Sequence, residues 1–197
     1  MRLPGEPLLP TDPIVAIGLY VLVPTWIALG LLDWFCHRAS GIAVHCGASE
    51  SFLHLLLLSL AGLGLLAGLF LEINELVLAF VVVCFIAHEG VAFCDIYLAN
   101  GCRRVSPLEQ RVHDYMTSIA VTLVFSLIVR HWDAATAAAL SPQSVLSAPI
   151  EMKQDPLPLL MTASIIGGVC IFNLIPYLLE LLSGLKHRHV ANKLPGL

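Results

Sequence analysis

The chain has 197 residues, of which 58% are hydrophobic and only 12% are charged, and its net charge is -4. Soluble domains carry about 25% charged residues, so this composition excludes an ordinary soluble protein. The small net charge and the lack of a basic run with interleaved aromatic residues exclude a nucleic-acid-binding protein. The length fits one domain, and we expect residues 1–197 to form a single all-α integral membrane domain.

Five apolar runs are each long enough to cross a bilayer, which takes about 20 mostly apolar residues. We therefore predict a polytopic helical bundle of about five transmembrane helices. The predicted transmembrane helices cover residues 13–36, 49–71, 75–98, 107–130 and 157–184. The segments between them are predicted to be loops, and they cover residues 41–48, 72–75, 99–107 and 130–155.

Helix starts carry capping signals. Asp12 precedes Pro13, and an acceptor followed by proline marks a first helical turn. Ser106 stands three residues before Glu109, the spacing of a capping box. Ser49 is expected to cap the second helix in a similar way.

The basic residues are distributed unevenly between the two sides of the predicted membrane. The positive-inside rule places the richer side in the cytoplasm, so the amino terminus is expected outside and the carboxy terminus in the cytoplasm. The richer side holds Arg38, Arg103, Arg104, Arg111, Lys186, Arg188 and Lys193, and the poorer side holds Arg2, Arg130 and Lys153.

Carboxylates and histidines recur in sets at the ends of four predicted helices. Within each set the spacing is four or seven residues, which puts both groups on one helical face. Because helices one and three end on the side where helices two and four begin, all the sets are expected to lie at one end of the bundle. The sets are Asp33 with His37, Glu50 with His54, His88 with Asp95, and Glu109 with His113.

Four carboxylates and four imidazoles in one plane are the donor set of a dinuclear metal centre. Carboxylate bridges and terminal imidazoles hold two metal ions in helical bundles, and two divalent cations would neutralise four carboxylates. Without metal, carboxylates crowded at the edge of a bilayer would repel one another. We therefore predict that the first four helices form a metal-binding bundle and that all eight residues are ligands of two divalent ions, with iron preferred and zinc or manganese as alternatives.

Each residue also has a simpler interpretation. Glu50 and Glu109 lie in first helical turns, where a carboxylate interacts favourably with the helix dipole. The histidines inside apolar stretches could belong to a hydrogen-bonded network without metal. Glu89 and Asp114 are candidates for catalytic groups that orient ligands or transfer protons, or they could face lipid headgroups.

For other polar residues the sequence predicts no part in chemistry. The arginines at 103, 104 and 111 are interpreted as determinants of topology and as contacts to headgroups. In the fifth helix, Asn173, Pro176 and Glu180 suggest a kink or an interhelical hydrogen bond.

Four stretches resemble a family of small bacterial multi-pass membrane proteins without an established function. They begin at Asp33 (DWFCHR), Glu50 (ESFLH), Ala87 (AHE) and Pro107 (PLEQRVHD). The resemblance implies a bacterial cytoplasmic membrane. Some members of that family carry a diguanylate cyclase label. This sequence lacks the GG(D/E)EF motif of those enzymes, so we reject that label for this chain. The site is also analogous to those of membrane di-iron oxidases, hydroxylases and desaturases, although their histidine boxes are absent.

The sequence thus predicts a membrane metalloenzyme that oxidises a lipophilic substrate with dioxygen, by hydroxylation or desaturation. Its partners would be membrane lipid or another lipophilic substrate and an external electron donor, since no redox domain is present. The alternatives are a metal-dependent hydrolase, a metal transporter or sensor, and a non-catalytic subunit of a membrane complex or homo-oligomer.

Overall fold

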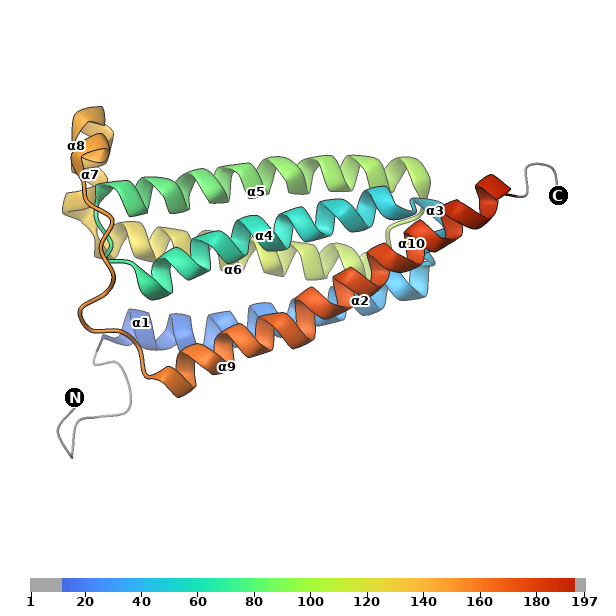
Figure 1. Cartoon of the computed structure of the whole chain (residues 1–197), viewed down its shortest axis with the longest axis horizontal. Coiled ribbons are helices and arrows are strands. Elements are labelled where there is room, and N and C mark those ends of the chain that lie inside the picture. The colour runs from blue at the N-terminus through green and yellow to red at the C-terminus, as the bar shows by residue number, and fades with distance from the viewer. Residues whose placement is uncertain (1–11, 194–197) are drawn as a thin grey trace.

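The structure is a computed structural model, and it describes the backbone of residues 12–193. Within that range, five helices are long and apolar enough to cross a membrane, which confirms the predicted all-α membrane bundle. They lie side by side with alternating direction (Figure 1). The first comprises α1 (Pro13–Ile17), η1 (Gly18–Leu22) and α2 (Val23–Ser40); the next three are α4 (Ala48–Phe70), α5 (Glu75–Cys102) and α6 (Pro107–Arg130); the last comprises α9 (Leu159–Val169), η2 (Cys170–Leu174) and α10 (Ile175–Lys193).

The outside of the bundle is apolar, and within the described residues the buried carboxylates and histidines lie at one end. Large side chains such as Phe93, Phe125 and Val83 are exposed to the surroundings, whereas His37 and Glu50 are completely buried. In water an exposed apolar surface of this extent would drive aggregation, but in a bilayer it faces lipid. The distribution therefore agrees with an integral membrane protein.

Two of the three expected caps are present. The Asp12 side chain accepts hydrogen bonds from the backbone of the first turn of α1, and Ser106 and Glu109 form the complete capping box of α6. The expected cap at Ser49 is wrong, because α4 begins one residue before it. Gly47 is the N-cap residue there, with a φ of 63° that favours glycine.

Two π-helical turns interrupt the first and last spans, and each lies next to a proline. Pro24 follows η1 and Pro176 follows η2. Proline has no N–H to donate and its ring clashes with the preceding turn, so the helix widens locally. The kink suggested by Pro176 is therefore a π-turn.

The expected long loop at residues 130–155 is wrong in part. It contains two short helices, α7 (Trp132–Leu140) and α8 (Pro142–Ser147), which pack against α5. The alanine-rich sequence of α7 has a high helix propensity, and Pro142 occupies the first turn of α8. These helices cover the end of the bundle opposite α3 (Ile42–His45), as Figure 1 shows.

The last span packs closely against its neighbours because glycines leave room. A Cβ on Gly30 would lie 2.1 Å from the side-chain nitrogen of Asn173, and one on Gly184 would lie 2.8 Å from the backbone nitrogen of Ala48. The contact at Gly30 lets Asn173 donate a hydrogen bond to the Ile27 carbonyl. Close packing at both points brings α10 against α2 and α4.

Candidate metal centre

The buried polar side chains gather where α2 and α5 end and where α4 and α6 begin. Seven of the eight ligands predicted from the sequence lie there, and two further residues join them from the end of α5 and from α10. The eighth, His88, lies outside this group and pairs with Glu89. We call this group the polar layer; its members are Asp33, His37, Glu50, His54, Asp95, Arg103, Glu109, His113 and Glu180.

Arg103 binds two glutamates at once. Its guanidinium donates to both oxygens of Glu50, at 2.6 to 3.2 Å, and to both oxygens of Glu109, at 2.5 and 3.0 Å. The side chain of Arg103 is only 3% exposed, and both glutamate side chains are fully buried. Charge-assisted bidentate pairs of this kind are the strong class of hydrogen bond.

The electrostatics of this cluster keep Arg103 charged. Burial on its own lowers the pKa of Arg103, but the hydrogen bonds that it donates to Glu109 and Glu50 outweigh burial and raise that pKa. The guanidinium therefore remains a permanent cation that holds the starts of α4 and α6 together.

Glu180 binds two histidines of different helices. The Nδ1 atoms of His37 and His54 lie 3.2 and 2.9 Å from its two carboxylate oxygens. The two imidazole rings are stacked, with centroids 4.1 Å apart and planes 10° apart. A carboxylate accepts hydrogen bonds, so each Nδ1–H donates to Glu180, and each Nε2 points elsewhere.

Both Nε2 atoms are buried beside carboxylate oxygens, yet neither forms a hydrogen bond. In His37, Nε2 lies 3.3 Å from Asp33 and 3.5 Å from Glu109; in His54 it lies 3.3 Å from Oδ1 of Asp95. The Asp95 oxygen also lacks a hydrogen-bond partner. With Nδ1 protonated, a neutral imidazole presents a lone pair at Nε2, and two acceptors facing each other need a shared proton or a cation.

The donor atoms are close enough together to hold an ion. One ligand atom from each of Asp33, His37, Glu109 and His113 lies within 4.8 Å of the others. The same holds for His37 with Glu50 and His54. A buried cluster of His, Asp and Glu side chains that could hold a metal ion is therefore present in this protein.

A cavity of about 80 Å³ borders this cluster. It is lined by Asp33, His54, Asp95 and His113 of the polar layer, and also by His88 of α5. Such a cavity has room for water or an ion beside polar partners. The unpartnered atoms of His54 and Asp95 belong to residues that line it.

The two residues predicted as catalytic lie in different settings. Glu89 accepts from Nδ1 of His88 at 3.2 Å, so it can hold that ring while Nε2 remains available. Asp114 lies on an exposed part of α6 and pairs with Arg111 at 3.3 Å. Because successive helical residues face different directions, Asp114 does not share the orientation of His113, and the structure does not bring it to the cavity.

Arg103 and Glu180 belong to the polar layer, but neither is among the site residues predicted from the sequence. A signal for Glu180 was present, because an ionisable residue inside an apolar span is by default a functional candidate. Asn173 and Tyr177 precede it at spacings that share its face, and the Tyr177 hydroxyl donates to Asp33 at 3.1 Å. For Arg103, a loop position next to Arg104 gave no sign that its side chain is buried.

Replacing Arg103 by Gln should lower the free energy of unfolding by about 3–5 kcal/mol, because two buried carboxylates lose their cation. Arg104→Gln is the matched control, since this neighbouring residue is exposed, and it should change stability by no more than about 0.5 kcal/mol. Chemical unfolding of the detergent-solubilised variants measures both. Equal small losses would contradict the structural importance of the Arg103 cluster.

No protein family model, curated protein or solved structure matches this chain. The bundle and its polar layer are therefore interpreted from the chain's own residues, and what the layer does is a matter for proposal.

Proposed function

We propose that this protein is a membrane metalloenzyme with a dinuclear iron centre, and that it oxidises a lipophilic substrate with dioxygen. The observation that carries the proposal is the pair of buried Nε2 atoms on His37 and His54. Glu180 accepts from the opposite nitrogen of each ring, which is how carboxylates orient metal-binding histidines. The ligating nitrogens then face carboxylate oxygens, as in a metal site.

The first ion fits among Asp33, His37, Glu109 and His113, whose donor atoms lie close together. The second would lie beside His54, which shares a close group of donor atoms with His37 and Glu50, and Asp95 and His88 line the cavity next to it. Both oxygens of Glu50 and both oxygens of Glu109 bind Arg103. A carboxylate has further lone pairs, so binding to metal as well remains compatible with these pairs.

The charge of the polar layer supports two divalent ions. It holds five carboxylates and one guanidinium, so with ionised carboxylates and neutral imidazoles four negative charges remain. Two divalent cations balance four charges, and mixed carboxylate and imidazole donors suit iron, manganese and zinc. Zinc has no redox chemistry, so the oxidation proposed here requires iron or manganese, of which iron is preferred.

The surroundings of the site favour oxidation over hydrolysis. The cavity beside the polar layer is also lined by Leu57, Leu58 and Ile96, and it lies inside a bundle whose outer surface is apolar. A hydrocarbon can therefore reach the site, whereas a hydrolase would have to admit a polar substrate and water.

In hydroxylation, a C–H bond of the substrate becomes C–OH with one atom of dioxygen. The other atom leaves as water after taking two electrons from a reduced electron-carrier protein and two protons from solvent. Within this chain, Glu89 is about one third exposed and its partner His88 lines the cavity. The two side chains would pass these protons from solvent to the oxygen atom that leaves as water.

A structural polar layer without metal is the second candidate. It is favoured by the direct contacts between imidazoles and carboxylates, such as the 2.9 Å pair of His113 and Asp33. In that case the imidazoles would be protonated and the carboxylates would neutralise them. The protein would then be a subunit or scaffold in a larger complex.

Metal content separates these two functions. Protein purified without chelators should contain about two iron atoms per chain, and His54→Ala should lose metal because it removes an unpartnered buried nitrogen. His45→Ala is the control, since His45 is exposed and its Nδ1 contacts only the Gly41 carbonyl. Elemental analysis gives the answer. Wild-type protein with no bound metal would favour the structural layer.

Glu180→Gln should weaken metal binding about 10- to 100-fold, the usual effect of losing a carboxylate that orients metal-binding histidines. The side chain keeps its size, so α10 should still pack at Gly184. Metal titration in the presence of a competing chelator measures the change. An unchanged affinity would show that the orientation of His37 and His54 does not matter for metal binding.

The orientation in the membrane is also part of the proposal. The excess of lysine and arginine at the polar-layer end supports a cytoplasmic site in a bacterial membrane, as expected for the family that the sequence resembles. Arg2, which counts toward the poorer side, lies outside the described residues.

Thiol labelling in intact cells tests this orientation with two single-cysteine chains. Gln143→Cys, on exposed α8, should react with an impermeant maleimide, whereas Cys102 at the polar-layer end should react only after permeabilisation. The reverse pattern would place the site outside.

A further inference from the structure

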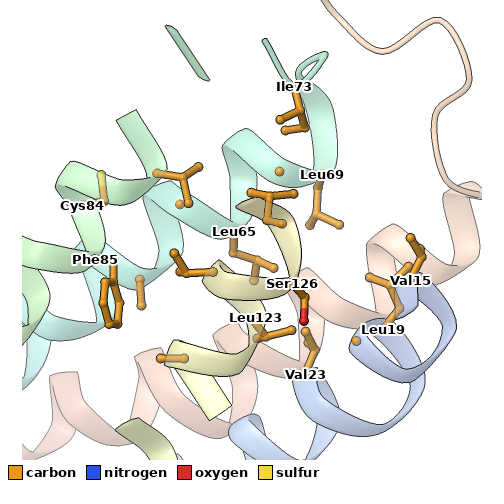
Figure 2. Close-up of a pocket in the computed structure, with 18 of the residues that line it drawn as sticks. Val15, Leu19, Val23, Leu65, Leu69, Ile73, Cys84, Phe85, Leu123 and Ser126 are labelled. Atoms are coloured by element: carbon orange, nitrogen blue, oxygen red, sulfur yellow. The ribbon is translucent and has the colours of Figure 1, made fainter. Parts of the chain in front are cut away.

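A second, larger cavity lies in the half of the bundle away from the polar layer. Its volume is about 300 Å³, at the lower end of the range for ligand pockets. Figure 2 shows its wall, to which Leu19, Leu65, Leu69, Phe85 and Leu123 contribute apolar side chains. A wall of this composition binds hydrocarbon.

The cavity is polar at the end that lies far from the site. Arg130, His131 and Lys153 line it there, and all three are cationic or can become so. Asp12 pairs with Arg130, and Glu72 lies near Lys153, but neither acid lines the cavity. The charged side chains that face the cavity are therefore basic, which complements an anionic head group.

Lys153 and His131 have donors to offer such a group. The Lys153 ammonium donates to the Gly68 carbonyl, and an ammonium has three donors in all. Burial lowers the pKa of Lys153 against an opposing effect of Glu72, with a smaller lowering by Arg130. Burial also lowers the pKa of His131, and Arg130 and Lys153 add to this effect. A bound anion would stabilise the charged forms of both groups.

At its other end the large cavity meets the small one beside the polar layer. Trp26 and His88 line both cavities. Along α6 the lining runs from Arg130 to Ala120 in the large cavity and continues to Thr117 in the small one. At 1.5 Å per residue this path is about 20 Å long, somewhat more than half of the roughly 30 Å hydrocarbon core of a bilayer.

Building on the proposed metal centre, we infer that its substrate is a single-chain fatty acid that lies along the bundle. The carboxylate binds Lys153 and His131, and the tail runs past Trp26 and His88 to the polar layer. Oxidation would therefore occur toward the methyl end of the chain. The cavity volume suits one alkyl chain and excludes a two-chain phospholipid.

The test uses palmitic acid with a photoreactive diazirine near its methyl end, added to the full chain in phosphatidylcholine vesicles. Mass spectrometry should find the adduct on residues that line the small cavity or its junction, such as Trp26, Met116 or Thr117. The same diazirine placed on hexadecanol or on a two-chain phosphatidylcholine should label these residues much less. Equal labelling by hexadecanol, or preferred labelling by the phospholipid, would overturn the inference.

Two pairs of variants make the test specific. Gly68 lines the large cavity, and a Cβ there meets nothing within 4 Å, so Gly68→Leu fills the cavity without a clash at Cβ. Gly62 has the same free space but does not line the cavity, so Gly62→Leu is its matched control. Gly68→Leu should reduce labelling about tenfold, equivalent to about 1.4 kcal/mol, and Gly62→Leu should leave it unchanged.

The head group is tested by Lys153→Gln, with the exposed Lys186→Gln at the other end of the bundle as control. Lys153→Gln should reduce labelling by palmitic acid, and an undiminished yield would refute the inference. Metal content is measured on the same samples. Bound metal without labelling refutes the fatty-acid substrate alone, whereas labelling of a metal-free chain refutes the metalloenzyme and leaves the binding of fatty acid standing.

Discussion

The burial of charge is the constraint on which the rest of this bundle depends. A carboxylate inside a membrane protein is costly unless it is paired, and Glu50 and Glu109 are both completely buried. Arg103 pairs with both carboxylates at once, and its own side chain is thereby buried. Since Glu50 lies in the first turn of α4, Glu109 in the first turn of α6 and Arg103 directly after α5, one guanidinium sets the relative positions of three helix ends. The histidines on the next turns of α4 and α6 then lie at the same depth.

The sequence predicted the spans and the shared end of the bundle because both depend on local patterns. Hydropathy over about 20 residues marks a span, and spacings of four or seven place groups such as Glu50 and His54 on one face. What it could not show is pairing between helices. Whether Arg103 faces headgroups or two glutamates depends on packing between segments far apart in the chain, as does the contact of Glu180 with His37, 143 residues away.

The last span shows how backbone irregularity supports the site. Pro176 widens the helix into a π-turn, and the residues that follow are presented in a register that a regular helix would not give. Asn173 and Tyr177 donate to backbone carbonyls of α2, at Ile27 and Gly30, while Glu180 reaches two imidazoles. The absence of a side chain on Gly30 permits this approach. A feature that looks like a defect in the helix thus helps to orient the histidines.

Access to the polar layer from outside the bundle is restricted. The side chains of His37, Glu50 and Glu109 are fully buried. Other polar-layer residues line the small cavity together with Trp26 and His88, and these last two residues also line the large apolar cavity. A polar molecule that enters the apolar cavity must give up its hydration, which costs free energy. A hydrocarbon that moves from lipid into the same cavity pays no such cost. The same burial that makes the charges costly therefore also limits which molecules can approach them, so that the stability of the bundle and the access to its polar layer have one physical origin.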